Sequence, residues 1–365
     1  MAKIKFNIFL FIIKLIIILL ALALVVIPVT LGLVMFLNSA PADYITKEKL
    51  SNTEGITIAQ DGGYFIEVRR GESAHLVGVR LERAGLIKNR YFWNLLCRLE
   101  KEHVKTGTYK IDMPKSQLAI LRTLIAGRQI LYKVTIPEGV TLSKTAMILE
   151  NAGICPAIDF LSAARDISII NYYGIPVNSN NATMEGYLFP DTYLFPKDFP
   201  ASKTVRTMAD NFFKKLENIS PTFRGLSLKE LNEKVILASI IEREYRIKDE
   251  APLMAGVFYN RLKLNMALQS CATVEYIITE IQGKPHPKVL LFSDLEIRNP
   301  YNTYILTGLP PGPISAPGTI ALRSVMYPEK TDFLYFRLTD ASSGKHYFSK
   351  TYDEHIRAGE LFIKP

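Results

Sequence analysis

The hydrophobic pattern begins with a continuous apolar stretch near the start of the chain. Residues Leu15 to Leu37 contain no charged side chain over about 23 positions, which is long enough for a helix that crosses a bilayer. Three lysines precede this stretch, at Lys3, Lys5 and Lys14. By the positive-inside rule, we expect a short cytoplasmic N-terminus, with the body of the chain on the other side of the membrane.

A cleaved signal peptide is the alternative interpretation, because Ala40-Pro41-Ala42 resembles a cleavage site. The apolar core of a signal peptide spans about 7–15 residues, and the stretch in this chain is much longer. We therefore favour an uncleaved anchor within residues 1–40, followed by a polar tether over residues 41–62.

Strand and helix patterns follow the tether, in an order that the chain repeats. Tyr64–Val68 is typical of a strand, and a turn and a helical pattern that ends at Arg83 come after it. The same order recurs as a strand at Lys133–Ile136, a turn at Glu138–Thr141 and a helix that ends at Asn151. The repetition predicts a duplicated strand–turn–helix unit, and two copies are too few for a solenoid.

The first copy, with the residues that follow it, resembles a LysM-like module, a small βααβ fold that commonly binds amino-sugar polymers. The resemblance covers Tyr64 to about Leu131, with Tyr109–Ile111 as the returning strand. A packing domain that only spaces the rest of the chain from the membrane fits the same pattern. Tyr91-Phe92-Trp93 would suit stacking on sugar rings, but aromatic residues at helical spacing belong more often to a core.

Another apolar helical pattern ends at Glu244. This glutamate continues the helical face of Leu237, Ile240 and Ile241, whereas Glu242 lies on another side. We expect Glu242 to be a surface charge, and a residue that supports the acid from behind is the alternative. A carboxylate on an apolar face is costly to ionise, so we expect the pKa of Glu244 to be raised. A carboxylic acid that stays protonated near neutral pH suits a general acid. The alternative is an ordinary surface glutamate paired with a lysine.

Composition narrows the possible function classes. The net charge is +9 and 22% of the residues are charged, without long blocks of one sign, so nothing indicates a nucleic-acid-binding arm. A basic excess of this size suits anionic lipids or an anionic wall polymer. The three cysteines lie far apart and the five histidines form no cluster, so we expect neither a metal nor another cofactor.

Seven motifs occur in order along the second half of the chain, and several are loops rich in Gly, Pro and aromatic residues. They are EGYLFPDTY at 185–193, LASIIERE at 237–244, VFYNRL at 257–262, MALQ at 266–269, NPYNTY at 299–304, GLPPGPISAPG at 308–318, and the hairpin strands FLYF at 333–336 and HYFS at 346–349. In this combination the chain resembles the YceG-like family of membrane-anchored endolytic murein transglycosylases over nearly its whole length.

The resemblance implies an enzyme that cuts the glycan strands of peptidoglycan internally, between N-acetylmuramic acid and N-acetylglucosamine. The cut uses no water and leaves 1,6-anhydro-muramoyl ends, which would terminate the elongation of nascent strands. The catalytic glutamate of the family falls on Glu244. Motif positions that would line the substrate groove fall on Gln269, Tyr301, Asn302, Thr303, Asn260 and Arg261.

The resemblance also implies a cell inner membrane location, with the body of the chain in the periplasm. Peptidoglycan synthases are the partners that it suggests. The fold that we expect is α+β: an N-terminal transmembrane helix, a LysM-like βααβ module over residues 63–132, and a mixed α/β lytic transglycosylase domain over residues 133–365.

Two alternatives fit the same residues. A non-catalytic scaffold for peptidoglycan synthases would bind glycan without making anhydro ends. A muramidase that uses water would need a second carboxylate near the acid, with Glu185, Asp191 and Glu275 as candidates. The family commonly has Asp-Pro where this chain has Cys271-Ala272, and an aspartate there would help to set the pKa of the acid.

Overall fold

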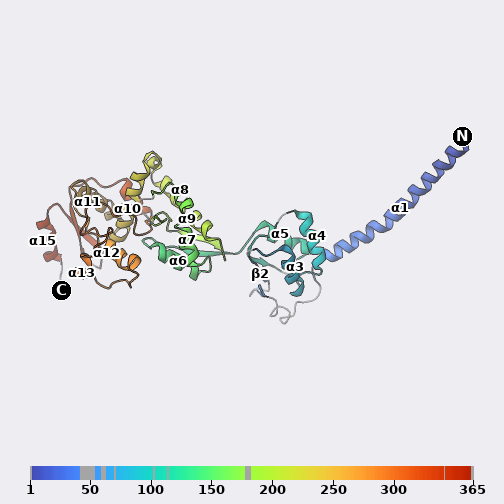
Figure 1. The fold of residues 1–365 in the computed structure, drawn as a ribbon, viewed down its shortest axis with the longest axis horizontal. Helices are drawn as coiled ribbons and strands as arrows, with labels where there is room; N and C mark the ends of the chain where they lie inside the picture. Colours follow the sequence, from blue (N-terminus) through green and yellow to red (C-terminus); the bar gives the residue numbers. More distant parts are fainter. Residues whose placement is uncertain are drawn as a thin grey trace. The chain divides into compact units, whose positions relative to one another are not determined.

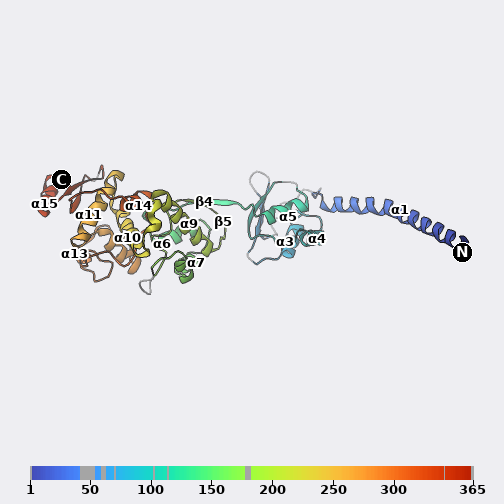
Figure 2. The ribbon, with the colours of Figure 1, turned by 90° about the horizontal axis from the view of Figure 1, so that it is seen from above.

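The computed structural model describes residues 2–41, 54–58, 63–69, 71–101, 103–112, 115–176, 182–340 and 342–362. It divides into two compact units, Met1–Leu131 and Tyr132–Pro365, each with its own hydrophobic core (Figures 1 and 2). Most of the predicted tether over residues 41–62 lies outside the described residues, as does Ala42 of the alternative cleavage site.

Helix α1 (Ala2–Asn38) contains the apolar stretch. Its segment Ile13–Asn38 is 26 residues long and apolar enough to cross a membrane. The end of the helix is bonded to the rest of the first unit, because the Asn38 side chain accepts a hydrogen bond of 2.9 Å from the Leu118 N–H in α5 (Gln117–Ala126). The predicted long apolar helix is therefore confirmed.

In its described residues, the rest of the first unit combines a three-stranded antiparallel sheet with the helices α3 (Ala74–Arg83), α4 (Arg90–Glu100) and α5. The strands β1 (Ile56–Ile58), β2 (Tyr64–Val68) and β3 (Gly107–Ile111) lie in the order β1-β2-β3. Helices α3 and α4 connect β2 to β3, and α5 packs into the same core. The predicted strand before α3, the helix end at Arg83 and the returning strand are confirmed.

Trp93 occupies the centre of this core. Its side chain is fully buried, and its indole N–H donates a hydrogen bond of 2.8 Å to the carbonyl of Ala74. A Cβ atom at Gly78 would lie 2.4 Å from the Trp93 ring, so the glycine lets α3 approach α4 closely. Phe92 is also buried, but Tyr91 is 68% exposed. The expected core role is confirmed for Phe92 and Trp93 and is wrong for Tyr91.

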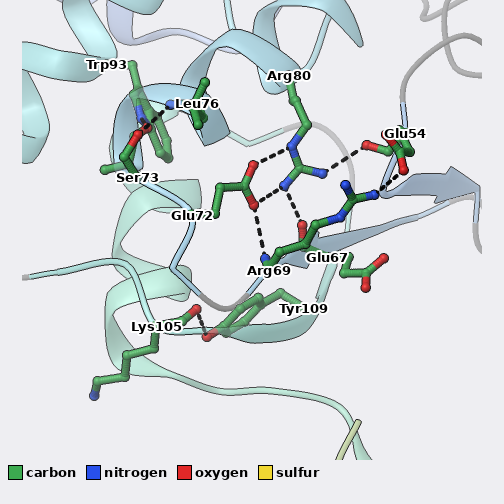
Figure 3. A network of polar contacts seen from close by, with 11 residues as sticks. Glu54, Glu67, Arg69, Glu72, Ser73, Leu76, Arg80, Trp93, Lys105 and Tyr109 are labelled. Carbon is green, nitrogen blue, oxygen red and sulfur yellow. Dashed lines mark hydrogen bonds and ion pairs between the residues drawn. The ribbon is translucent and has the colours of Figure 1, made fainter. Parts of the chain in front are cut away.

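An arginine joins the sheet of the first unit to α3 (Figure 3). The guanidinium of Arg80 forms two hydrogen bonds to the Glu72 carboxylate, of 2.8 and 2.7 Å, and donates to the carbonyls of Glu54 and Glu67. The Arg80 and Glu72 side chains are only 15% and 10% exposed. Arg69, which pairs with Glu54 nearby, is 48% exposed. The largely buried guanidinium of Arg80 therefore has an acceptor for each of its three nitrogen atoms, which offsets the cost of removing the charge from water.

The second unit begins with the second copy of the strand–turn–helix pattern. Strand β4 (Leu131–Thr135) pairs with β5 (Thr192–Pro196), and α6 (Leu142–Asn151) follows the turn. The predicted strand and helix of this copy are thus confirmed. Further helices of this half are α7 (Ala157–Ala163), α8 (Ile167–Tyr172) and α9 (Ala201–Ile219).

Helix α10 (Leu228–Glu244) runs through the core of the second unit. It begins with a capping box, in which Ser227 and Glu230 satisfy each other's backbone N–H groups. Every residue from Val235 to Ile241 is buried. The helix is therefore enclosed on all sides towards its end, whereas the sequence predicted a single apolar face.

The remaining helical elements are η1 (Pro221–Gly225), η2 (Lys248–Glu250), α11 (Ala251–Lys263), α12 (Cys271–Tyr276), η3 (Ile277–Ile281), α13 (Phe292–Leu295), α14 (Thr319–Met326) and α15 (Tyr352–Phe362). Of these elements, α11, α12 and α14 contact α10 directly. Strands β6 (Tyr335–Asp340) and β7 (Lys345–Ser349) form the predicted antiparallel hairpin. The Pro- and Gly-rich loop at 308–318 contains no helix or strand, as predicted.

Replacing Arg80 by methionine should destabilise the first unit. The change keeps most of the side-chain volume but leaves the largely buried Glu72 carboxylate without its partner, so the free energy of unfolding should fall by about 2 kcal/mol. Guanidinium titration followed by the fluorescence of Trp93, the only tryptophan of the chain, reports on this unit. Arg69→Met is the matched control and should have a clearly smaller effect. Equal effects of the two variants would contradict this account.

Candidate active site

Glu244 is the last residue of α10, and its side chain is half-buried where the enclosed helix ends. Ser270 Oγ donates a hydrogen bond to Glu244 Oε1, and no ion pair joins Glu244 to Lys248 among the described residues. Burial raises the pKa of Glu244, and the Ser270 hydroxyl and the Arg243 guanidinium offset only part of that rise. The Glu244 carboxyl group therefore keeps its proton to a higher pH than an ordinary glutamate, in line with the raised pKa that the sequence predicted.

Ser270 is itself held in place by the NPYNTY loop. Its backbone N–H donates to Thr303 Oγ1 at 3.1 Å, and Thr303 Oγ1 lies 2.9 Å from the hydroxyl of Thr273. The preceding residue, Gln269, donates its N–H to the Thr303 carbonyl at 2.9 Å and adopts a positive φ of 52°. The strained turn at Gln269 thus presents the Ser270 hydroxyl to the end of α10.

A second carboxylate lies close to Glu244 but is already paired. Glu275, in α12, is 2.6 Å from Arg243 and 3.3 Å from His286 Nε2. Its negative charge contributes to the raised pKa of Glu244. Because Arg243 is the residue before Glu244, the pair also ties the end of α10 to α12.

The loop at 308–318 is fixed to α10 by two polar residues of the helix. Ser239 Oγ accepts a hydrogen bond of 3.0 Å from the Ile314 N–H, and its carbonyl accepts one of 2.8 Å from Ser315 Oγ. Glu242 Oε2 accepts the Gly318 N–H at 2.8 Å, and burial raises the pKa of Glu242 to about 7. The expectation that Glu242 is a surface charge is therefore wrong, because the loop covers it.

Two of the predicted substrate-binding residues use their side chains to shape the NPYNTY loop. Asn302 is fully buried: its Nδ2 donates to the carbonyls of Leu295 and Ile297, and its Oδ1 accepts the Tyr304 N–H, all at 2.9 Å. Thr303 is 2% exposed and supports Ser270. Both residues therefore act on the site indirectly, by positioning the residues next to them.

Two others brace the last hairpin against α11. Asn260 Nδ2 donates to the carbonyls of Thr331 and Phe333, at 2.7 and 3.0 Å. Arg261 is 8% exposed, and its guanidinium donates to the carbonyl of Leu334 and to those of residues 267 and 268, just before Gln269. Arg261 therefore supports the turn that carries Ser270.

The remaining two predicted residues reach the surface. Gln269 is exposed, and Tyr301 lines a cavity of about 530 Å³. The Tyr301 and Tyr276 rings lie 5.1 Å apart in its wall. Because Tyr301 precedes Thr303 by two residues and Tyr276 follows Glu275, the cavity and the Glu244 site share the segments 270–280 and 299–304.

The other candidate second carboxylates have partners of their own. Both oxygens of Glu185 accept the Leu142 N–H, at 3.1 and 2.9 Å, at the N-terminus of α6. Burial raises the pKa of Glu185 to about 8. Asp191 lies 2.9 Å from Lys215 and accepts a hydrogen bond from Asn211. Neither carboxylate contacts Glu244.

Cys271 stands at the first position of α12, next to Ser270. Its Sγ lies 3.0 Å from the hydroxyl of Tyr304, and burial raises the pKa of its thiol. A neutral thiol here adds no charge beside Glu244, unlike the aspartate that the family commonly has. Among the described residues, no group of three or more His, Cys, Asp or Glu side chains has the arrangement of a metal site.

The most important residue that the sequence analysis missed is Ser270. The sequence shows only a small hydroxyl residue directly after the MALQ motif. Sequence alone does not connect this position with Glu244, which precedes it by 26 residues. Together, Glu244 and Ser270 can present one protonated carboxyl group, in a fixed orientation, to a bond beside it.

Comparisons with known proteins bear on the family to which the chain belongs. The model of the YceG-like family matches residues 66–360. A crystal structure of a yceG-like protein from Listeria monocytogenes has 31% sequence identity and a TM-score of 0.55, and covers 80% of this chain and 98% of that one.

Two curated relatives carry the name endolytic murein transglycosylase. The one from Bacillus subtilis (strain 168) is 30% identical over 314 residues, which is 82% of this chain and 84% of the relative. The one from Streptococcus pneumoniae serotype 2 (strain D39 / NCTC 7466) is 30% identical over 322 residues, 80% of this chain. The chain spans only 57% of the length of that relative. With a family match over more than half of its residues, the chain belongs to the YceG-like family.

Proposed function

We propose that this protein is an endolytic murein transglycosylase. It would cleave peptidoglycan glycan strands between N-acetylmuramic acid and N-acetylglucosamine, leave 1,6-anhydro-muramoyl ends and so terminate nascent strands. Its relatives in B. subtilis and S. pneumoniae carry this name. The observation that carries the proposal is the carboxyl group of Glu244 at the end of α10. Burial raises its pKa, and it accepts a hydrogen bond from the Ser270 hydroxyl.

In the proposed reaction, Glu244 acts first as an acid and then as a base. The protonated carboxyl group gives its proton to the glycosidic oxygen as the bond from C1 of the muramic acid breaks. The 6-hydroxyl of the same sugar attacks C1 and gives its proton to the Glu244 carboxylate, which restores the acid. The nucleophile is tethered to the reacting carbon, so its attack has the advantage of proximity. One carboxyl group is therefore enough.

A hydrolase would need a second carboxylate to hold water or act as nucleophile. The nearest one, Glu275, is paired with Arg243 and His286. Glu185 and Asp191 are also bonded to other groups. These pairings favour the reaction without water.

The six predicted substrate-binding residues divide into two groups under this proposal. Gln269 and Tyr301 would contact the glycan, since their side chains reach the surface or the cavity. Asn302, Thr303, Asn260 and Arg261 would act by positioning the two loops that carry Gln269, Ser270 and Tyr301.

The first unit would keep the enzyme at its substrate. We propose that α1 is a single-pass anchor in the cell inner membrane, with a cytoplasmic N-terminus and a periplasmic body. The order β2-α3-α4-β3 supports a LysM-like module over residues 63–132, followed by the catalytic domain over 133–365. Peptidoglycan synthases, which make the nascent strands, would be its partners.

Glu244→Gln should abolish cleavage while keeping the shape of the site. The amide cannot supply the proton, so the rate should fall by at least 10²–10⁴-fold, on the order of what general acid–base catalysis contributes. Polymerised, uncrosslinked glycan strands are incubated with each protein, and mass spectrometry identifies the new ends. Wild type should make internal cuts with anhydro-muramoyl ends. Strands that wild type binds but never cuts would instead support the glycan-binding scaffold.

Ser270→Ala should change the pH dependence of cleavage. The active form has Glu244 protonated, so kcat/KM is high below the pKa of Glu244 and falls as the pH rises through it. The Ser270 hydroxyl lowers that pKa, so its removal should move the fall to higher pH. The exposed residue Ser293 provides the control Ser293→Ala, with an unchanged profile. A shift of the Ser270→Ala profile to lower pH would contradict this role.

A further inference from the structure

The cavity that Tyr276 and Tyr301 line contains charged and polar groups to which the proposed cleavage reaction assigns no role. Its wall combines two carboxylates, Glu185 and Glu280, with an arginine at the rim, Arg165. Two prolines of the 308–318 loop, Pro311 and Pro313, belong to the apolar part of the lining. A uniformly neutral sugar would not need this separation of charge.

The two carboxylates meet at the N-terminus of α6. Glu185 is 6% exposed and accepts the Leu142 N–H, whereas Glu280 accepts hydrogen bonds from the hydroxyls of Thr141 and Ser143, at 3.0 and 2.5 Å. A carboxylate offers roughly four acceptor sites, so both groups keep sites for a further donor. Glu280 also raises the pKa of Glu185 by repulsion, so a cation between them would relieve an unfavourable interaction.

A buried donor in the same cavity also lacks a partner. Asn232 of α10 is 7% exposed, and its Oδ1 is taken by the hydroxyl of Tyr187 at 2.8 Å. Its Nδ2 donates no hydrogen bond within the described part of the chain, although the side chain lines the cavity. Because Asn232 lines the cavity, its Nδ2 is available to donate to an oxygen atom of a ligand there.

Arg165 supplies a second donor for the same kind of oxygen. It is exposed at the rim and forms no ion pair with the residues that the structure describes. The cavity therefore offers both acceptors and donors to a ligand. The Tyr276 and Tyr301 rings also line it and provide faces for a cation.

We propose that this cavity binds a stem-peptide residue of murein whose side chain ends in a free ammonium group. The ammonium would lie between Glu185 and Glu280, and peptide carbonyl or carboxylate oxygens would accept from Asn232 and Arg165. The inference rests on the proposed function. It fits the chemistry of the substrate, because the stem peptide is attached to the same muramic acid whose bond at C1 would be broken at Glu244.

This site would make the enzyme selective for uncrosslinked strands. A cross-link turns the ammonium group into an amide, which has no charge and cannot satisfy two carboxylates. The cavity would thus distinguish nascent glycan from the finished wall by reading the peptide rather than the sugar.

The test uses the full chain in detergent and two preparations of uncrosslinked glycan strands, one with free stem-peptide amines and one with these amines acetylated. Wild type should cleave the free-amine strands with a kcat/KM about tenfold higher, the size of one charge-assisted hydrogen bond. Glu280→Gln should erase this preference through KM and leave cleavage of acetylated strands unchanged. The exposed, cavity-remote Glu296→Gln should keep the preference. Equal cleavage of both preparations by wild type would overturn the inference.

Binding measured without cleavage separates this inference from the proposed function. Glu244→Gln, which cannot cut, should retain free-amine strands about tenfold more tightly than acetylated ones, through the same charge-assisted hydrogen bond. Loss of this difference in Glu244→Gln/Glu280→Gln would support the cavity as the cause. If wild type cuts neither preparation, the proposed function fails, and the binding ratio still decides the inference. A ratio near one would overturn it.

Discussion

The hydrogen bond from Ser270 to Glu244 joins the two halves of the site. One end of it depends on α10, a helix enclosed by core on all sides at Val235–Ile241, so that its last carboxyl group cannot move away from its position. The other end depends on the turn at Gln269, which the NPYNTY loop holds through Thr303. Rigid elements on both sides orient the carboxyl group, which is the main requirement for a single acid–base residue.

Enclosure of α10 has a cost that the structure offsets locally. Polar groups at Ser239, Glu242 and Glu244 enter an apolar environment, and each receives a donor from a different loop residue, at 314, 318 and 270. The same bonds therefore satisfy buried polar groups and assemble the loops around the acid. The loops cannot rearrange without leaving those groups unpaired, so stability and the geometry of the site are coupled.

Sequence reasoning was most effective where the signal is local. The apolar helix at the N-terminus, the strand at Tyr64–Val68, the closing hairpin and the raised pKa of Glu244 all follow from periodicity, turn residues and burial of nearby positions. It failed where contacts between distant segments decide. Glu242 was expected at the surface because nothing local indicates that Gly318 covers it. Tyr91 was expected in the core, but α3 packs on the opposite side of α4 against Trp93.

The roles within the motifs show the same limit. The NPYNTY and VFYNRL residues were predicted to line a groove because they stand at motif positions of the family that the chain resembles. The side chains of Asn302, Asn260 and Arg261 instead satisfy backbone carbonyls of neighbouring loops. A motif identifies a site but does not distinguish the residues that contact a ligand from those that position them. Only the hydrogen-bond partners make that distinction.

The central claim is that Glu244 activates an intramolecular attack rather than a water molecule. Cleavage in water enriched in heavy oxygen tests this directly, because the oxygen at the new C1 end is either the sugar's own O6 or comes from solvent. The account predicts new ends that contain no heavy oxygen and have the anhydro mass. One heavy oxygen atom in each new end would contradict it and identify the protein as a hydrolase.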